Sequence, residues 1–511
     1  MSYRSALFLM ALSSAAAAQQ PQPETSGIAG QNQPNASGVG QSFSDPSQLF
    51  SGRAGAFFGL AFQSIGGEGL YASTVINTEF NLGDVGIGLA LPLNLLVKNN
   101  DNCCGPDPAP DGSHPHSRDY KTYSGIIRRR DWDEWQSYTK LVRFVRYGHK
   151  RDPVYFTAGQ LWGASIGHGT LVSRYSNSLN LDHTKFGLAL DFNSDYVGLE
   201  TLTDSVGAPS LLATRAYVRP LGGTPILRGW ALGVTFATDR TAPRALSYNP
   251  DGSVAQDPQS GTIKVASQDA IYAGGVDTEF EVLHNSLISL IPYVDLNRIA
   301  GAGNGLHAGV LADIYFPIPL LAVNLEARLE YRMMQPGYIP EYFDQTYDLG
   351  RIQYAVAGTC AAGVSPCPTA YQPKYVAASD AHRLAADPRA VDRKGYYGEL
   401  SFGFAGFLQI GGLYQDYEGD PQGASLGLFA TFPKIELVKI SAYYLRKNMK
   451  GTSDAFAIDE RSLLAGALAY KMFGPLYLRV EFQRRWQLRP DAKQIEAVDS
   501  FSAGLATFIS F

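Results

Sequence analysis

The strongest constraint on the fold is a two-residue alternation that recurs along the chain in segments of roughly ten residues. In AVNLEARLEYR, 322–332, one face carries only Val, Leu, Ala and Tyr, whereas the other carries Asn, Glu and Arg. The segments TKFGLALDFN at 184–193, GGVDTEFEV at 274–282 and PLYLRVEFQRRW at 475–486 alternate in the same way. Such strands fit a soluble sandwich, whose apolar face meets a core, or a membrane barrel, whose apolar face meets lipid.

The connections between the segments favour the barrel. Counting from Ala54, we identify twenty candidate strands. The even-to-odd connections are all brief, and they lie at 81–84, 149–152, 193–195, 221–225, 284–286, 316–319, 405–406, 432–436 and 473–475. The odd-to-even connections hold every long insertion, at 100–133, about 241–267, 339–393, 449–460 and 489–497. A membrane barrel sorts short turns and long loops to opposite sides in this way, whereas a soluble sandwich has no reason to.

Composition agrees with a strand-rich protein and excludes two other classes. The chain has 53 Gly, 29 Tyr and 26 Phe, a mixture typical of many twisted strands with aromatic edges. Its net charge of -5 carries no basic excess, so we expect no nucleic-acid partner. After the first twenty residues, no apolar run approaches the roughly 18 residues that a membrane-spanning helix needs.

The N-terminal region predicts export. Residues 1–18 combine Arg4, an apolar stretch and a run of small residues, which is the pattern of a secretory signal peptide. Residues 19–50 are rich in Gln, Pro, Asn, Gly and Ser, and we expect them to form a disordered periplasmic tail. The remaining part, 51–511, is the predicted barrel.

The signal pattern, the sorting of the loops and the terminal strand DSFSAGLATFISF together resemble the large Gram-negative outer-membrane β-barrel porins. The resemblance implies an all-β, antiparallel, up-and-down transmembrane barrel of about 18–20 strands in the bacterial outer membrane. It also implies that Phe511 is an assembly residue read by the barrel-insertion machinery. Among these porins, the alginate and exopolysaccharide exporters are the nearest in size. The implied partners are outer-membrane lipid, lipopolysaccharide, the barrel-assembly machinery and periplasmic export components.

If the apolar faces meet lipid, the opposite faces line a wet lumen. We therefore predict a channel for polar solutes, with carbohydrate or exopolysaccharide as the favoured cargo. Part of the charge is expected to be structural, because Arg and Glu on neighbouring strands satisfy one another. The predicted lumen-lining residues are Lys185, Asp191, Arg215, Arg219, Asp277, Glu279, Glu281, Glu326, Arg328, Glu330, Arg332, Arg479, Glu481 and Arg485.

One glycine-dense connection, 159–185, is a candidate constriction. Trp162, His168, Arg174 and Tyr175 suit a loop that folds inward, where guanidinium and aromatic groups contact sugars. The alternative is a long hairpin with an ordinary outer loop. Elsewhere, Cys360 and Cys367 are a possible disulfide, because an exported protein meets an oxidising compartment, and free thiols are the alternative.

Three functions stay open at this stage. The channel is the first; a closed barrel that displays its long loops as an adhesin or receptor is the second. The third is an outer-membrane lipid hydrolase, for which Ser165, His168 and Ser173 lie close in sequence but without a G-x-S-x-G motif. We expect no enzymatic activity, no cofactor and no metal.

Overall fold

The computed structural model describes most of the chain from residue 54 onward. The described residues are 54–65, 69–82, 84–99, 132, 138–148, 150, 152–178, 185–224, 227, 229–255, 263–284, 287–316, 323–357, 369–379, 390–404, 408–420, 423–432, 437–488 and 495–509. The predicted signal peptide, the predicted tail, Cys360, Cys367 and Phe511 lie outside these ranges.

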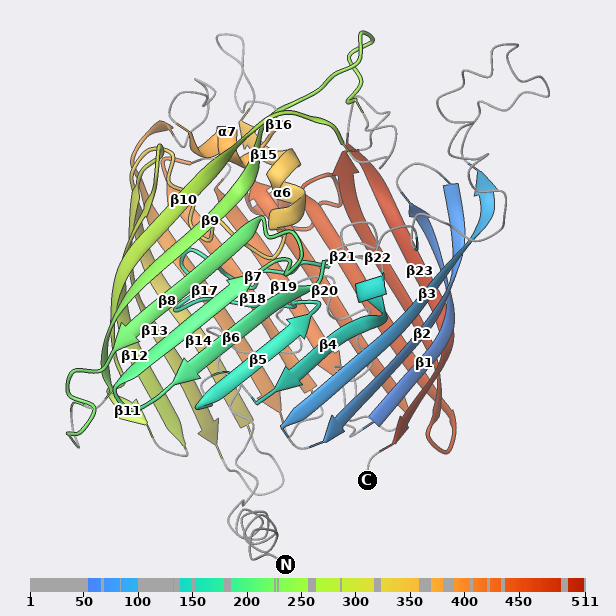
Figure 1. Cartoon of the computed structure of the whole chain (residues 1–511), viewed down its shortest axis with the longest axis horizontal. Coiled ribbons are helices and arrows are strands. Elements are labelled where there is room, and N and C mark those ends of the chain that lie inside the picture. Colours follow the sequence, from blue (N-terminus) through green and yellow to red (C-terminus); the bar gives the residue numbers. More distant parts are fainter. Residues whose placement is uncertain are drawn as a thin grey trace, which may run out of the picture.

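The chain forms one antiparallel sheet that closes on itself (Figure 1). Its first strand pairs with its last, from Ala54 opposite Ile509 to Gln63 opposite Ser500. The sheet contains 21 described strands, but β11 continues β10 along the same partner, β12, so the wall corresponds to 20 barrel strands. The predicted antiparallel barrel is confirmed, at the upper end of the predicted range.

The barrel strands vary greatly in length. Strands β4 to β8 are much shorter than β9 and β10, so the wall is uneven in height (Figure 1). The strands are β1 (Ala54–Ile65), β2 (Gly69–Leu82), β3 (Val85–Asn99), β4 (Val142–Tyr147), β5 (Val154–Gly159), β6 (Gly187–Asn193), β7 (Val197–Thr203), β8 (Leu211–Val218), β9 (Trp230–Leu246), β10 (Val265–Phe280), β11 (Leu283–His284), β12 (Ile288–Ile299), β13 (Asn304–Phe316), β14 (Val323–Met334), β17 (Arg393–Phe404), β18 (Leu408–Glu418), β19 (Ala424–Phe432), β20 (Val438–Met449), β21 (Ser462–Phe473), β22 (Leu476–Leu488) and β23 (Ile495–Ile509).

The connections sort by side as the sequence predicts. The connections at the end where β1 begins and β23 ends are short, and they include those that join β2 to β3, β4 to β5, β6 to β7, β13 to β14, β17 to β18, β19 to β20 and β21 to β22. The long insertions after β5, β9 and β14 begin at the opposite end (Figure 1).

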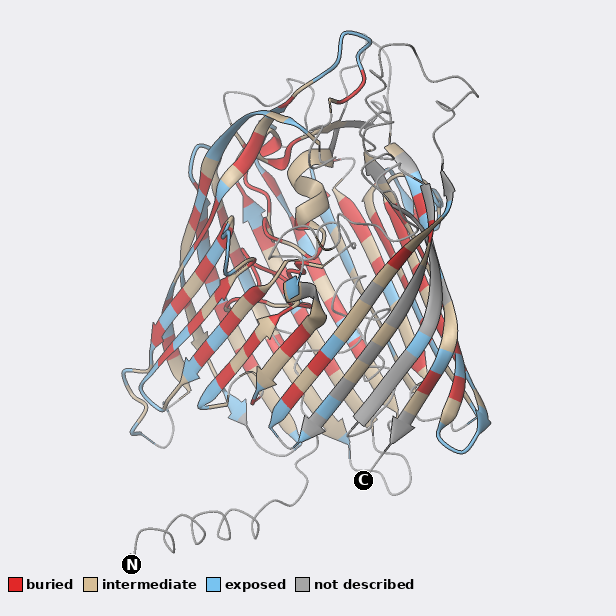
Figure 2. Ribbon diagram, turned by 45° about the vertical axis from the view of Figure 1, so that its right-hand side comes forward, coloured by how far each residue is buried: buried red, intermediate tan, exposed pale blue. Residues whose placement is uncertain are grey.

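The two faces of the wall are inverted relative to a soluble protein (Figure 2). Large apolar side chains point outward and are exposed, such as Val234 at 62%, Leu329 at 54% and Tyr396 at 70%. The charged residues between them, such as Glu330 and Arg332, point inward and are buried. Exposed apolar side chains all around a closed barrel are stable only against lipid, so this fold spans a membrane through its strands. Among the described residues, no helix has the length and apolar character to span a membrane.

Two connections enter the barrel. The first inner segment, 160–178, follows β5, and the second inner segment, 335–379 without 358–368, follows β14. The second contains α6 (Tyr347–Gln353), α7 (Lys374–Ala378) and the hairpin β15 (Tyr354–Ala357) and β16 (Thr369–Gln372), whereas the first has no strand or helix. Two short 3-10 turns, Thr139–Leu141 and Thr452–Asp454, lie in other connections.

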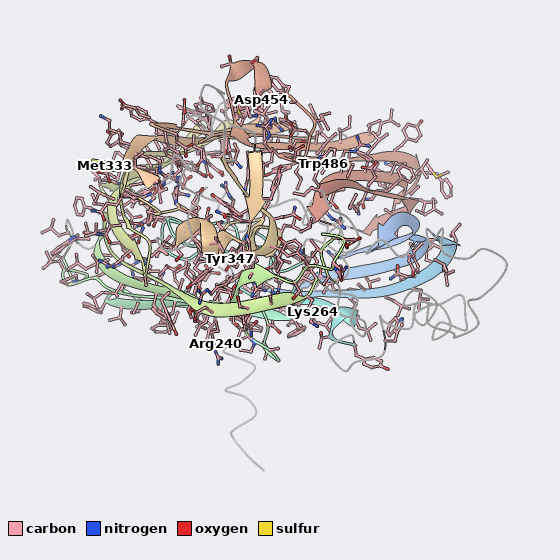
Figure 3. The ribbon with its side chains drawn as sticks, turned by 90° about the horizontal axis from the view of Figure 1, so that it is seen from above. Arg240, Lys264, Met333, Tyr347, Asp454 and Trp486 are labelled. Atoms are coloured by element: carbon pink, nitrogen blue, oxygen red, sulfur yellow. The ribbon has the colours of Figure 1, made fainter. Side chains whose placement is uncertain are left out.

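The second inner segment corrects the sequence analysis. The sorting of the loops predicts that 339–393 is one of the long loops on the outer side of the barrel. Instead, Tyr342, Phe343 and Tyr347 pack in one apolar cluster with Ala237 and Ala273 on the inner faces of β9 and β10. Seen from above, Tyr347 lies within the ring of strands (Figure 3). Aromatic burial therefore draws this connection inward.

Candidate functional site: the charged lumen

A band of charged side chains runs along the inner wall from β6 to β12. Strand register places Asp191 opposite Glu200, and Glu200 opposite Arg215. Arg215 donates from Nη1 to Glu200 at 3.1 Å, and from Nε and Nη2 to the two oxygens of Asp277 at 3.0 and 2.5 Å. Lys150, from the turn after β4, closes the band through Asp191 at 3.3 Å and Glu200 at 3.0 Å. Most of these charges neutralise one another in place.

A second charged cluster lies on β13 and β14. Glu330 accepts hydrogen bonds from Nε of Arg328 at 2.7 Å and from Nε of Arg332 at 2.6 Å. Nδ1 of His307 lies 3.1 Å from the Glu330 oxygen that also accepts from Arg332. Alternate residues of one strand supply all three charged groups, which is why a period of two in the sequence predicts the cluster.

The first inner segment leaves the wall at a glycine. Gly159 has φ of +119°, and a Cβ at this position would lie 2.4 Å from the carbonyl oxygen of Arg143. Any other residue would be both strained and in collision with the backbone of β4. Glycine at 159 therefore lets the chain turn from β5 into the lumen.

His168 fixes the first inner segment to the wall of β10 and β12. Its Nδ1 lies 2.8 Å from Asp295 and its Nε2 lies 2.6 Å from Glu279, while its ring stacks on Tyr293 at 4.0 Å and 10°. Burial alone would lower the pKa of His168, but the two carboxylates outweigh it and raise the pKa to about 10. The ring is thus a buried imidazolium between two carboxylates.

Arg174 reaches the opposite wall. This residue has φ of +50°, and its guanidinium forms an ion pair with Glu399 and donates to the Tyr397 hydroxyl at 3.0 Å, both on β17. The neighbouring Tyr175 donates to Asp348 of α6 at 3.1 Å. The first inner segment therefore spans the lumen from β5 to β17 and contacts the second inner segment on the way.

Helix α6 also spans the lumen. At one wall, Tyr347 and Arg351 both donate to Asp239 of β9 at 2.7 Å. At the other, Gln353 donates to the carbonyl of Trp486 at 2.8 Å and accepts from the backbone N–H of Leu488 at 2.7 Å. Figure 3 shows Tyr347 inside the ring and Trp486 at the wall.

A cavity of about 180 Å³ remains between the inner segments and the wall formed by β17 to β22. Its lining mixes both charge signs with amides, hydroxyls and aromatic rings. The charged lining residues are Arg174, Glu341, Asp344, Arg393, Asp420, Lys447, Glu460 and Arg461. This balanced polar lining suits a neutral or zwitterionic hydrophilic solute.

The structure groups most of the predicted lumen residues and separates a few. Asp191 pairs with Lys150 and Arg215 pairs with Asp277 along the wall, and Glu279 contacts His168 of the first inner segment. Buried inward positions hold Glu326, Arg328, Glu330 and Arg332 on β14, and Arg479, Glu481 and Arg485 on β22.

Three predicted residues lie at the ends of strands. Lys185 precedes β6 and pairs with Asp204 at 2.7 Å, and Arg219 follows β8 and donates to Asn193 at 2.9 Å. Glu281 directly follows β10 and is partly buried.

The four predicted constriction residues all lie in the first inner segment, but they contact different parts of the wall. Trp162 packs near β4, His168 at β10 and β12, and Arg174 and Tyr175 near β17 and α6. The sequence analysis missed Asp239, Asp344 and Arg351, which hold the second inner segment. The available signal was the aromatic density of GYIPEYFDQTYDLGRIQY, 337–354, which is unusual for a solvated loop.

Two chemical possibilities can be compared with this geometry. His168, Asp277 and Asp295 present potential metal ligands within 4.8 Å of one another, but Arg215 already occupies Asp277 and the carboxylates occupy both ring nitrogens of His168. For a hydrolase, His168 would have to activate a serine. The Ser165 hydroxyl instead accepts the backbone N–H of Arg174.

The chain has no matching family model or curated relative, and its similarity to solved structures is low. Among solved structures, OccK8 (OprE) of Pseudomonas aeruginosa is 10% identical with a TM-score of 0.32, covering 89% of this chain and 96% of its own. Wzi of Escherichia coli, a carbohydrate-binding β-barrel involved in group 1 capsule assembly, is 8% identical with a TM-score of 0.31, covering 90% and 85%. These values carry no argument, so the fold rests on the strand pairing itself.

Proposed function

We propose that the chain is an outer-membrane channel for polar solutes. The observation that carries the proposal is the polar cavity beside β17 to β22, inside a closed barrel whose outer face is apolar. A strand barrel with an apolar exterior and a charged interior is the form taken by proteins of the bacterial outer membrane. Paired charges in the lumen favour solutes that are hydrophilic without a strong net charge.

Carbohydrate is the cargo that this lining suits best. Sugar hydroxyls donate and accept hydrogen bonds, and the cavity offers both kinds of partner as well as the rings of Tyr354, Tyr417 and Trp486. Its volume of about 180 Å³ is below the range of roughly 300–1,000 Å³ typical of pockets for larger ligands. Single sugars are therefore the first candidates, and translocation of an exopolysaccharide requires the second inner segment to leave the lumen.

The test is reconstitution of the full chain into planar bilayers and liposomes. We expect measurable conductance, and liposome swelling that is faster for a monosaccharide than for a tetrasaccharide. The paired variants Lys447→Met in the cavity and Lys394→Met, whose side chain is exposed beside Glu418, separate a lumen effect from a general charge effect. Neither conductance nor swelling in wild type would refute the channel.

A receptor or adhesin is the second candidate, because both inner segments occupy the lumen. A closed barrel that only displays its outer connections would bind its partner without conducting. Cell adhesion that survives a blocked lumen and disappears when the outer connection 247–264 is shortened would favour this reading over the channel.

A further inference from the structure

Arg143 differs from the other arginines that are fully buried in the described part of the chain. Arg332, Arg446 and Arg479 each form an ion pair with a carboxylate. Arg143 is 1% exposed, yet no described carboxylate lies within ion-pair distance of it. Burial of a guanidinium without an anion costs free energy of folding. Such an unpaired charge therefore indicates a functional role.

A β-bulge in strand β4 sets the direction of the Arg143 side chain. The pairing of β3 with β4 is irregular between Gly88 and Leu89, which lie opposite Phe144 and Val142, so Arg143 is the extra residue of a bulge. Bulges re-aim a side chain. The first inner segment begins beside it, because Gln160 donates its N–H to the carbonyl of Arg143 at 2.6 Å.

Trp162 and Phe144 form the rest of the surroundings. The guanidinium carbon of Arg143 lies 5.1 Å from the centre of the Trp162 ring, and the Phe144 ring meets Trp162 edge-on at 5.7 Å and 74°. The cation contacts the aromatic face, which partly compensates its burial but accepts none of its hydrogen bonds. The aromatic rings of Trp162 and Phe144 therefore lie beside the positively charged guanidinium of Arg143.

Four nitrogen donors of Arg143 and Trp162 have no acceptor among the described residues. They are Nε, Nη1 and Nη2 of Arg143 and the indole Nε1 of Trp162, and each is buried without a hydrogen-bond partner. Buried donors in native proteins are nearly always satisfied, and each unsatisfied one costs about 1–3 kcal/mol. A group with several acceptor oxygens and negative charge satisfies all four at once.

We propose that Arg143 and Trp162 bind the carboxylate of an organic acid solute in the lumen. The guanidinium presents two parallel N–H groups that match the two oxygens of a carboxylate. The aromatic carbon of Trp162 and Phe144 favours a solute with a carbon skeleton over an inorganic oxyanion. A sugar acid such as gluconate has both parts. This site is distinct from the cavity beside β17 to β22, whose lining excludes both residues.

Calorimetric titration of the full chain in detergent tests the proposal directly. Sodium gluconate is the probe, glucose is the uncharged comparison and phosphate is the inorganic one. We expect saturable binding of gluconate only, weakened about tenfold or more in Arg143→Gln and severalfold in Trp162→Phe. Arg484→Gln is the matched control, because Arg484 pairs with Asp499 at the exposed end of β22, and it should bind as wild type does.

The outcomes are separable from those of the channel experiment, because the titration needs no membrane and no conductance. Heat-modifiable gel mobility establishes that each variant is folded, and Trp162→Phe keeps the site testable if Arg143→Gln does not fold. Saturable gluconate binding that Arg143→Gln and Trp162→Phe leave unchanged would overturn the site. Equal binding of phosphate would overturn the choice of an organic acid, and absence of binding would mean that solvent alone satisfies the donors.

Discussion

The two inner segments occupy the same lumen but differ in local structure and in the charged groups that anchor them. The first is glycine-dense and has no helix or strand, and buried ion pairs of His168 and Arg174 tie it to the wall. It also packs apolar side chains in the same cluster as the second, among them Leu161, Leu171 and Val172. The second is rich in aromatic residues, and burial of Tyr342, Phe343 and Tyr347 holds most of it. Both segments therefore combine apolar packing with ion pairs, and the second buries the larger share of aromatic area.

The anchoring side chains of the two segments also differ in their exposure to solvent. His168 and Arg174, which anchor the first segment, are 2% and 13% exposed. Two anchors of the second segment are wetter, because Arg351 is 19% exposed and Lys447 of β20, which pairs with Asp344, is 32% exposed. Screened contacts are weaker than desolvated ones. We therefore expect the second segment to move first and to control the width of the pore.

The largest expected effect comes from removing the second segment. Replacement of residues 337–390 by a short Gly/Ser turn between β14 and β17 should raise single-channel conductance severalfold, because α6 and its aromatic cluster no longer cross the lumen. Shortening the outer connection 249–262 is the control and should leave conductance unchanged. Equal conductance of wild type and the 337–390 variant would show that this segment does not limit the pore.

The second prediction compares the two arginines. Arg174→Gln leaves Glu399 buried without its cation and should lower the free energy of unfolding by about 3–5 kcal/mol. Arg351→Gln should cost about 1–2 kcal/mol, because Tyr347 and the backbone N–H of Thr241 still donate to the Asp239 carboxylate. Urea unfolding of the refolded barrel, followed by tryptophan fluorescence, measures both. A larger loss for Arg351→Gln would reverse our ranking of the two segments.

The third prediction concerns pH. The pKa of His168 rises from 6.5 to about 10 on folding, so its contribution to stability is complete below about pH 6.5 and disappears progressively up to about pH 10. The difference in urea midpoint between wild type and His168→Gln should shrink across this window. Because other groups titrate in both proteins, only the difference is informative. A difference that is constant from pH 6.5 to 10 would contradict a charged His168.

The smallest expected effect is a single hydrogen bond of α6. Tyr347→Phe keeps the aromatic ring in its cluster but removes the donor to Asp239, which should cost about 1 kcal/mol. Hydrogen exchange should report faster local opening of 347–353. Tyr396→Phe is the control, because that ring is 70% exposed on the outer face and its change should leave α6 exchange unaltered.

The barrel was predictable because its determinants are local. Leu325, Glu326 and their neighbours alternate between apolar and polar along one strand, and the length of each connection can be counted directly in the sequence. The inward position of 335–379 was not predictable in this way. It depends on Tyr347 meeting Ala237 and Ala273, residues far away in the sequence that share the inner face of β9 and β10 only after the barrel closes.

The site shows the same limit. A two-residue period predicts that Glu330 and Arg332 share a face, and the structure places both on the buried side of β14. It cannot predict that His168 lies between Asp295 and Glu279, because that contact joins a loop to two strands more than a hundred residues away. Arg143 also escaped notice, since a bulge breaks the period that would have revealed it.

The seam between β1 and β23 has a consequence for how the molecule is made. It joins the two ends of the sequence through small residues, such as Gly59 opposite Gly504 and Ala61 opposite Ser502. Until the final strand pairs with β1, the sheet has two unpaired edges and an exposed apolar surface. Both features favour aggregation. The barrel therefore cannot close before its last strand is available, and we expect the unclosed chain to need protection from aggregation until then.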